Sequence, residues 1–193
     1  MSGHKETISI EAIIDCSVRL FREKGYRSTS LEEVAEAFGV KRQAIYHYFN
    51  NKNDILFCII DRMLKKFTAE IDDAFRKSLP HHEKFIRVLI AHAKVAMEFS
   101  SYVAVWQEER KQLPEDVKIE LNKIFMEYHE EMFKLYDQGV ETGNFIKTNT
   151  KYAVLTLLGA CTWSYNWYEE GCCEPDKLAS EIVNFISKGF IKA

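Results

Sequence analysis

Proline is scarce in this chain, and the places where it occurs limit what the chain can fold into. The 193 residues contain 3 prolines, Pro80, Pro114 and Pro175, and 8 glycines. Between these breaks, apolar residues recur at three- and four-residue steps, which is the spacing of one face of an α-helix. Long segments that lack proline and glycine favour helices over strands and turns. No segment has the pattern of a strand, so the sequence predicts an all-α fold.

The breaks also set the expected helices. Ser30-Leu31-Glu32-Glu33 has the pattern of a capping box, in which the Ser30 hydroxyl accepts the amide of Glu33 and the Glu33 side chain reaches back. Asn51 can cap a long helix of roughly 37 Å at 1.5 Å per residue. The helices are expected at about residues 8–24, 31–38, 42–49, 52–77, 82–100, 101–112, 115–142, 150–170 and 176–191.

Composition excludes disorder and a membrane span. The chain is 47% hydrophobic and 28% charged, which is enough apolar material for a core. The longest uncharged run, residues 152–168, is interrupted by polar residues and is shorter than the roughly 20 apolar residues of a span. Residues 1–6 lack the apolar segment of a signal peptide. We therefore expect a cytoplasmic protein without membrane contact.

The cysteines and histidines predict no metal site. Five cysteines without a C-x-x-C spacing argue against a disulfide framework or a zinc site. Cys172-Cys173 leaves open a strained vicinal bridge or a thiol sensor, although two ordinary loop thiols are the favoured interpretation. His81-His82-Glu83 leaves metal binding open as a minor alternative to a helix start. No metal and no cofactor are expected.

Motifs of common enzyme classes are missing from the sequence. No G-x-S-x-G, G-x-x-x-x-G-K-[ST], G-x-G-x-x-G or H-E-x-x-H occurs. A helical di-iron protein would need Glu-x-x-His pairs, and none is present. We therefore expect that the chain is not an enzyme.

The first part of the chain predicts a helix-turn-helix. Two short helices, 31–38 and 42–49, are joined by a turn at Gly39 and follow a longer helix. An α-helix fits the major groove of DNA when its exposed face offers donors and cations. Arg42 and Gln43 are the types that read guanine and adenine edges, whereas the other candidates suit phosphates. The candidate DNA-binding residues are Thr29, Ser30, Lys41, Arg42, Gln43, Tyr46, His47, Tyr48 and Lys52.

A simpler interpretation makes Lys41-Arg42 a solvated helix start and Tyr46 and Phe49 core residues. For Phe49 that interpretation is favoured. For the other candidate residues DNA binding is favoured, because all of them occur together at the spacing of a helix-turn-helix. The charge is consistent with two parts, since residues 1–52 carry 8 Lys or Arg and 7 Asp or Glu, within a chain of net charge −3. We expect a DNA-binding domain over 1–52 and a second domain over 53–193.

The segments TSLEEVAEAFGV at 29–40, AIYHYF at 44–49 and NK at 51–52 resemble the DNA-binding signature of the TetR family of transcriptional regulators. The resemblance covers about residues 8–56. It implies a three-helix DNA-binding domain and a helical C-terminal domain that dimerises and binds a small-molecule inducer. Lys41 stands where the family usually has Ser or Thr, and Gln43 replaces a common Gly or Pro. The base preference of the family therefore does not carry over.

A second resemblance lies in the C-terminal part. The segments WQEER at 106–110, GVETGNF at 139–145 and 163–175 are similar to the branch of that family that responds to fatty acyl-CoA. This implies a repressor that a hydrophobic effector, a fatty acyl-CoA, releases from operator DNA, with control of lipid or fatty-acid metabolism genes. It also implies a homodimer through the last two helices. That branch often has a basic residue where this chain has Asn166. Alternatives are a drug or aromatic effector, or a partner-binding module without a ligand.

An acyl-CoA site needs an apolar tunnel with cations near its mouth. Lys94, Arg110 and Lys111 are the candidate cations. Helix core is the competing interpretation for each aromatic residue. The candidate ligand-binding residues are Phe99, Tyr102, Val103, Trp106, Arg110, Phe125, Tyr128, Met132, Leu158, Trp163 and Trp167.

Overall fold

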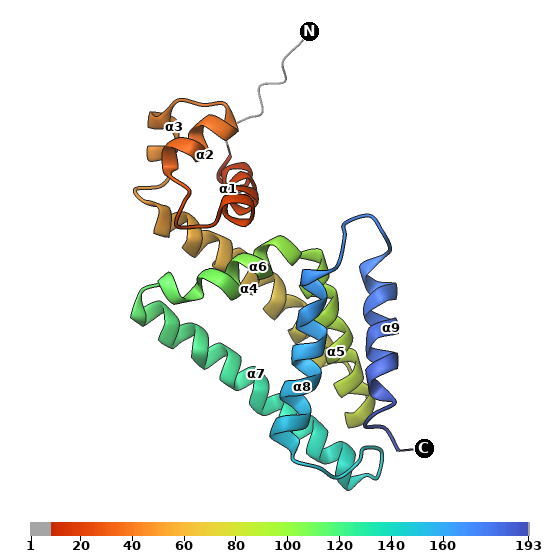
Figure 1. The fold of residues 1–193 in the computed structure, drawn as a ribbon. Coiled ribbons are helices and arrows are strands. Elements are labelled where there is room, and N and C mark those ends of the chain that lie inside the picture. The colour runs from red at the N-terminus through yellow and green to blue at the C-terminus, as the bar shows by residue number, and fades with distance from the viewer. Residues whose placement is uncertain (1–8, 193) are drawn as a thin grey trace.

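A computed structural model describes residues 9–192 and confirms the all-α prediction (Figure 1). Within that range the only strand-like feature is an isolated bridge between Phe145 and Ile191. Residue 8, the expected start of the first helix, and residues 1–6 lie outside the described part. The elements are α1 Ile10–Lys24, α2 Leu31–Phe38, α3 Arg42–Tyr46, α4 Lys52–Arg76, α5 His81–Glu98, α6 Ser100–Glu109, η1 Arg110–Gln112, α7 Glu115–Glu141, α8 Thr150–Thr162, η2 Trp163–Asn166 and α9 Pro175–Ser187.

Helices α1, α2 and α3 form a small unit at one end of the molecule, and α4 leads from it into the larger bundle (Figure 1). The small unit closes around the fully buried side chains Ile13, Val34 and Ile45, with Phe21 and Phe49 beside them. The expected boundary between residues 52 and 53 falls at the first turn of α4.

Both predicted caps are present. The Ser30 hydroxyl accepts the Glu33 amide at 3.2 Å, and the Glu33 carboxylate accepts the Ser30 amide at 2.8 Å. The Asn51 side chain accepts the Asp54 amide at 3.1 Å and so starts α4. Each side chain satisfies an amide that the helix leaves without a partner. These caps fix where the chain enters α2 and where it enters α4, on either side of the α2–α3 pair.

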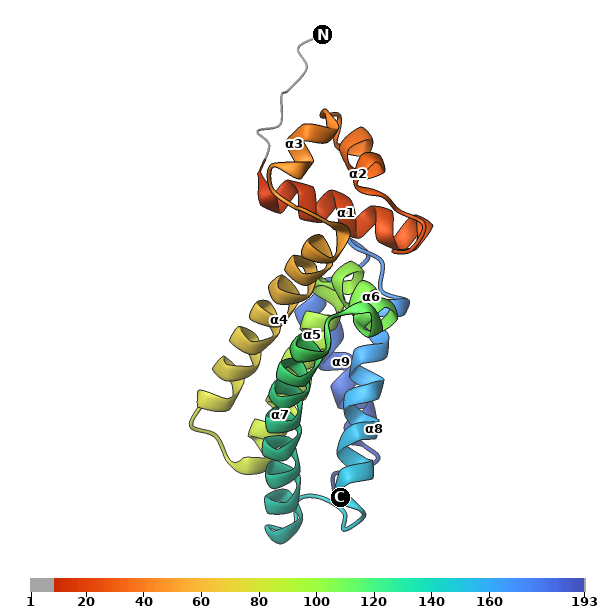
Figure 2. The ribbon, with the colours of Figure 1, turned by 90° about the vertical axis from the view of Figure 1, so that its left-hand side faces the viewer.

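Helix α5 is the centre of the larger bundle, where it packs against α4, α7, α8 and α9. Figure 2 shows α4, α7 and α8 running alongside one another below the small unit. The far end is closed by tilted and edge-on rings of Phe85, Tyr136, Phe145 and Phe190. A Cβ on Gly139 would lie 2.2 Å from the Phe145 ring, so glycine is required there.

Several helices end earlier than the sequence predicts. The helix expected over 150–170 stops at Thr162, and a short 3-10 turn follows. The buried hydroxyl of Ser164 donates to the Cys161 carbonyl at 2.8 Å, and such side-chain bonds compete with the helical pattern. Likewise α3 stops at Tyr46 rather than at residue 49. The Tyr48 amide donates to the Ile45 carbonyl at 2.9 Å in the turn that follows, and Asn51 then caps α4. Helix α9 ends at Ser187, after which the Phe190 carbonyl accepts the Ile146 amide at 2.9 Å.

Helices α5 and α6 meet at Phe99 with a bend of 89°. Across residues 9–192, no helix taken singly has both the length and the hydropathy to cross a membrane, and only this bent pair meets that test when its two helices are taken together.

Candidate functional site

Helix α3 and the turn after it present one polar surface to solvent. Ile45 and Phe49 point into the core of the small unit. The six other candidates on this segment are exposed: Lys41, Arg42, Gln43, Tyr46, His47 and Tyr48. A helix that buries its apolar side and exposes cations, an amide and ring hydroxyls has the chemistry needed in a major groove.

An acidic residue that is not among the predicted site residues contacts part of this surface. The Glu32 carboxylate on α2 pairs with the Arg42 guanidinium at 2.8 Å. Arg42 also donates to the Tyr46 hydroxyl at 3.1 Å and lies 4.8 Å from the centre of its ring. The pKa of Arg42 is raised, by the Tyr46 bond first and by Glu32 second. Arg42 is therefore held in place before any DNA arrives.

Two of the predicted phosphate contacts hold the loop before α2 in place. The Thr29 side chain is buried, and its hydroxyl donates to the Gly25 carbonyl at 2.9 Å. The Lys52 ammonium donates to the Thr29 carbonyl at 2.7 Å, to the Arg27 carbonyl at 3.3 Å and to the Tyr26 carbonyl. Burial lowers the pKa of Lys52. Ser30, the third candidate near this loop, is occupied by the capping box.

The larger bundle contains a cavity in two connected parts. An outer cleft of about 510 Å³ lies between α5, α6, α7 and α8. An inner cavity of about 80 Å³ extends from it toward α4, where Met63 and Phe67 form part of its wall. The two parts share five lining residues: His92, Trp106, Gln107, Phe125 and Thr162. Arg110 lines the outer cleft, and its guanidinium lies 5.6 Å from the centre of the Trp106 ring.

A polar group sits at the junction of the two parts. The His92 ring contacts the Tyr128 hydroxyl through Nδ1 at 3.0 Å and the Thr162 hydroxyl through Nε2 at 2.7 Å. Burial lowers the pKa of His92 to about 4, with a further contribution from His129. Burial also raises the pKa of Tyr128. Both groups are therefore neutral near pH 7.

The structure brings together six of the eleven candidate ligand-binding residues. Val103 lines the inner cavity, and the others line the outer cleft or both parts: Trp106, Arg110, Phe125, Tyr128 and Leu158. These six side chains come from α6, η1, α7 and α8 and face the same hollow, and their role in ligand binding stays a prediction.

The other five lie elsewhere. Phe99 and Tyr102 face a separate depression beside α1, where the Tyr102 hydroxyl donates to the Asp15 carboxylate. Met132 is core. Trp163 and Trp167 follow the early end of α8, and they remain 58% and 50% exposed.

Among the candidate cations, Lys94 also lies away from the cleft, pairing with Asp176 at 3.2 Å and with Glu98 at 3.7 Å. His92, Gln107 and Thr162 were missed. Only the position of His92 within an apolar helix could have drawn attention to it.

Two family models match the chain. Residues 13–58 match the model described as bacterial regulatory proteins of the tetR family. Residues 78–190, more than half of the chain, match the model described as the tetracyclin repressor-like C-terminal domain. The chain belongs to the TetR family. It is a transcriptional regulator with a helix-turn-helix for DNA, and its relatives are regulators rather than enzymes.

The chain is also similar to curated regulators and to solved structures. The repressor KstR2 of Rhodococcus jostii is 23% identical over 184 residues, covering 92% of this chain and 88% of the relative. The fatty acid metabolism regulator protein of Bacillus subtilis is 25% identical over 131 residues, 68% of each chain. The crystal structure of AibR in complex with isovaleryl coenzyme A and operator DNA superposes with a TM-score of 0.77 at 20% identity, covering 91% of this chain and 96% of that one.

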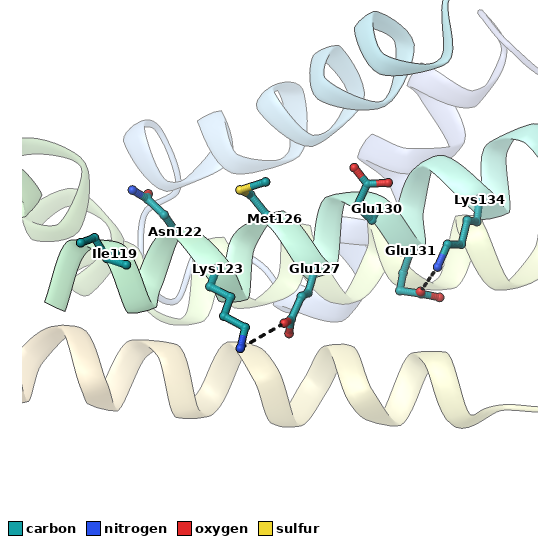
Figure 3. A pocket seen from close by; sticks show the side chains of 8 residues that line it. All are labelled: Ile119, Asn122, Lys123, Met126, Glu127, Glu130, Glu131 and Lys134. Atoms are coloured by element: carbon teal, nitrogen blue, oxygen red, sulfur yellow. Dashed lines mark hydrogen bonds and ion pairs between the residues drawn. The ribbon is translucent and has the colours of Figure 1, made fainter. Parts of the chain in front are cut away.

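The outer face of α7 carries a large open depression (Figure 3). All the side chains that line it stand on this one helix, so it is a broad surface rather than an enclosed site. Its charged residues form short pairs along the helix, such as Lys134 with Glu131 at 2.6 Å. Asn122 and Met126 also line the outer cleft, so the depression leads to the cleft's mouth.

The last two helices, α8 and α9, leave large apolar side chains exposed. Tyr152 on α8 is 70% exposed and Phe185 on α9 is 76% exposed. Leu155 and Trp163 are exposed on the same stretch. Large exposed apolar groups on adjacent helices mark an interaction surface.

Two kinds of candidate site remain, the cysteine thiols and a metal site. All five cysteines are free, and the Cys172 and Cys173 sulfurs lie 3.3 Å apart. The Cys173 pKa is raised by its hydrogen bond with Cys172, which disfavours the reactive thiolate. Among residues 9–192, no three His, Cys, Asp or Glu side chains lie close enough together to hold a metal ion.

Proposed function

We propose that this TetR-family regulator is a homodimeric repressor that an acyl-CoA releases from operator DNA, controlling genes of lipid or fatty-acid metabolism. The observation that carries the proposal is the two-part cavity, with apolar and aromatic walls, neutral polar side chains inside and Arg110 at the outer cleft. A thioester of this class combines an apolar acyl chain with anionic phosphates. Because the inner cavity has no charged lining residue, the acyl chain belongs inside and the phosphates outside.

In this proposal the exposed face of α3 enters the major groove. Arg42 and Gln43 read base edges, and Lys41, Tyr46, His47 and Tyr48 bind phosphates. Thr29 and Lys52 support this surface through the loop before α2, and Ser30 through the helix cap. Two copies, paired through α8 and α9, would place their α3 helices one or more helical turns apart. Binding of operator DNA would take place in the cytoplasm.

Two similarities support the choice of effector. The B. subtilis relative is a fatty acid metabolism regulator, and AibR was crystallised with isovaleryl coenzyme A and operator DNA. KstR2 supports the alternative of a cyclic ligand, since one solved KstR2 is described as a ketosteroid regulator. The two candidates differ in shape, so direct binding distinguishes them.

The test uses tryptophan fluorescence in a variant that keeps only Trp106, made by Trp163→Phe and Trp167→Phe. The two replaced residues lie outside the cavity, and Trp106 stacks on Phe125 with ring centres 5.5 Å apart. We expect acyl-CoA to change the Trp106 emission saturably, and free CoA to have a much weaker effect. If no acyl-CoA changes the emission and a steroid does, the acyl-CoA effector would be wrong, and the proposal of a repressor would stand with a steroid as its effector.

A further inference from the structure

Three polar side chains from three helices meet where the inner cavity joins the outer cleft. His92 comes from α5, Tyr128 from α7 and Thr162 from the end of α8, and the two ring nitrogens of His92 lie 3.0 and 2.7 Å from the hydroxyls. Phe67 packs edge-on against both His92 and Tyr128, so the group lies among aromatic rings. We call it the polar trio.

The direction of the hydrogen bonds in the polar trio follows from a fourth contact. The Thr162 hydroxyl donates to the Leu158 carbonyl at 2.9 Å, so its oxygen accepts the proton on Nε2 of His92. A neutral imidazole carries one proton, so Nδ1 accepts from the Tyr128 hydroxyl. All the trio's protons are then used within the protein. In this state the polar trio offers acceptors to the cavity and no donor.

A change of tautomer reverses this chain without creating a charge. If the Thr162 hydroxyl turns to Nε2, Nδ1 carries the proton and donates to the Tyr128 oxygen. The Tyr128 hydroxyl proton then becomes free to point into the cavity. The Leu158 carbonyl loses one bond but stays within α8, where a backbone amide is its regular partner.

We propose that the polar trio binds the carbonyl of the effector's acyl group, with Tyr128 as the donor after the relay reverses. This inference rests on the proposed function, since it places one group of the same effector. His92 and Thr162 line both parts of the cavity, which puts the carbonyl at their junction. The inner 80 Å³ has room for roughly two or three water-sized groups. The acyl chain beyond the carbonyl is therefore short or branched.

Calorimetric titration of the full-length protein tests this with a matched ligand pair. Butyryl-CoA has the thioester carbonyl, and S-butyl-CoA has a methylene in its place. We expect the wild type to bind butyryl-CoA roughly threefold to tenfold more tightly, the range of one neutral hydrogen bond. Tyr128→Phe should bind both ligands alike. Tyr136→Phe is the control, because Tyr136 lies on the same helix but donates to the Ile146 carbonyl outside the cavity.

The outcomes separate the two proposals. A wild type that binds the two ligands equally, or a Tyr128→Phe variant that keeps the preference, would overturn the carbonyl contact and leave the acyl-CoA regulator standing. Binding of palmitoyl-CoA without binding of butyryl-CoA would do the same. No binding of any acyl-CoA would overturn both proposals.

Nitrogen NMR of the histidine rings tests the relay itself. We expect His92 to carry its proton on Nε2 in the free protein and on Nδ1 in the butyryl-CoA complex, with its signals assigned by their loss in His92→Gln. A tautomer that stays the same on binding would contradict the reversal.

Discussion

At the scale of single residues, an acidic side chain, Glu32, lies beside the α3 surface that we propose binds DNA. Glu32 would face phosphates on this proposed surface, and its carboxylate forms an exposed ion pair with Arg42. Pairs of this kind contribute only about 0–1 kcal/mol. Repulsion between Glu32 and DNA is therefore expected to outweigh the benefit of holding Arg42 in place.

Glu32→Gln should accordingly tighten operator binding, by about twofold to tenfold in Kd at fixed salt, as measured by fluorescence anisotropy. Glu36→Gln is the matched control, since Glu36 lies on the same helix, is exposed and makes no ion pair with Arg42. Equal tightening by both variants would show a general charge effect. Weaker binding by Glu32→Gln would show that Arg42 depends on its partner.

His92 gives the second prediction at this scale. Its pKa is lowered to about 4 from an ordinary value of 6.5, so between these values the unfolded chain binds the extra proton and the folded chain does not. The free energy of unfolding should therefore rise with pH across this window, and the contribution of His92 is at most ~1.4 kcal/mol per pH unit. Adding acid should lower the free energy of unfolding across the same window.

Urea unfolding at several pH values, compared between the wild type and His92→Gln, measures this contribution. The variant should show a shallower dependence between pH 4 and 6.5. Identical slopes would mean that His92 is protonated in the folded protein.

At the scale of elements, Lys52 shows how a helix start supports a loop. It is the first residue of α4, and its ammonium bonds to three carbonyls of the loop between α1 and α2. Lys52→Met keeps an unbranched apolar stem but removes the ammonium and these bonds. We expect a loss of about 1–3 kcal/mol in the free energy of unfolding, because the carbonyls lose a charged partner.

The salt dependence of DNA binding discriminates the two roles of Lys52. If Lys52 supports the loop, Lys52→Met should weaken binding to all DNA sequences and leave the slope of log Kd against log salt unchanged. If Lys52 instead contacts a phosphate, Lys52→Met should lower that slope by about one, with little change in the free energy of unfolding.

The sequence located most elements because their ends are chemically marked. Ser30, Asn51 and the three prolines stand at helix starts, and local side-chain chemistry is enough to place them. The early end of α8 was not predictable, because it depends on the buried Ser164 hydroxyl and on contacts with α5 and α6. Trp163 and Trp167 were assigned to the cavity for that reason.

The candidate site was predictable to a similar extent. The exposed face of α3 follows from helical periodicity alone, since Ile45 and Phe49 fix the inward side. The roles of Thr29 and Lys52 as loop supports depend on a contact between residues more than twenty positions apart, which no local pattern records. The polar trio likewise joins three separate helices.

At the scale of the whole molecule, α6 connects the cavity with the DNA-binding unit. It carries Trp106 into the cavity, and at its other end the Tyr102 hydroxyl donates to Asp15 of α1. Arg62 of α4 pairs with the same carboxylate at 3.2 Å. A ligand that prefers one position of α6 can therefore shift the small unit, provided that its affinity for the two states differs.

The dimer is predicted at this scale as well. Phe185→Glu places a charge on the exposed face of α9, so we expect dimers to dissociate while the helical circular dichroism is kept. Light scattering after size-exclusion chromatography measures the mass. Met126→Glu, which introduces the same charge on α7 at a side chain 64% exposed, should remain dimeric. A dimeric Phe185→Glu, or a monomeric wild type, would contradict the α8–α9 interface.

The central claim is that one ligand-filled cavity controls one DNA surface. The most direct test is fluorescence anisotropy of the protein on the duplex upstream of its own gene, or on a duplex selected from genomic DNA. The complex is titrated with acyl-CoA. The salt concentration is held fixed because phosphate contacts make the affinity strongly salt-dependent. We predict tight binding that acyl-CoA reverses and free CoA does not. Tight binding that no acyl-CoA alters would contradict the account.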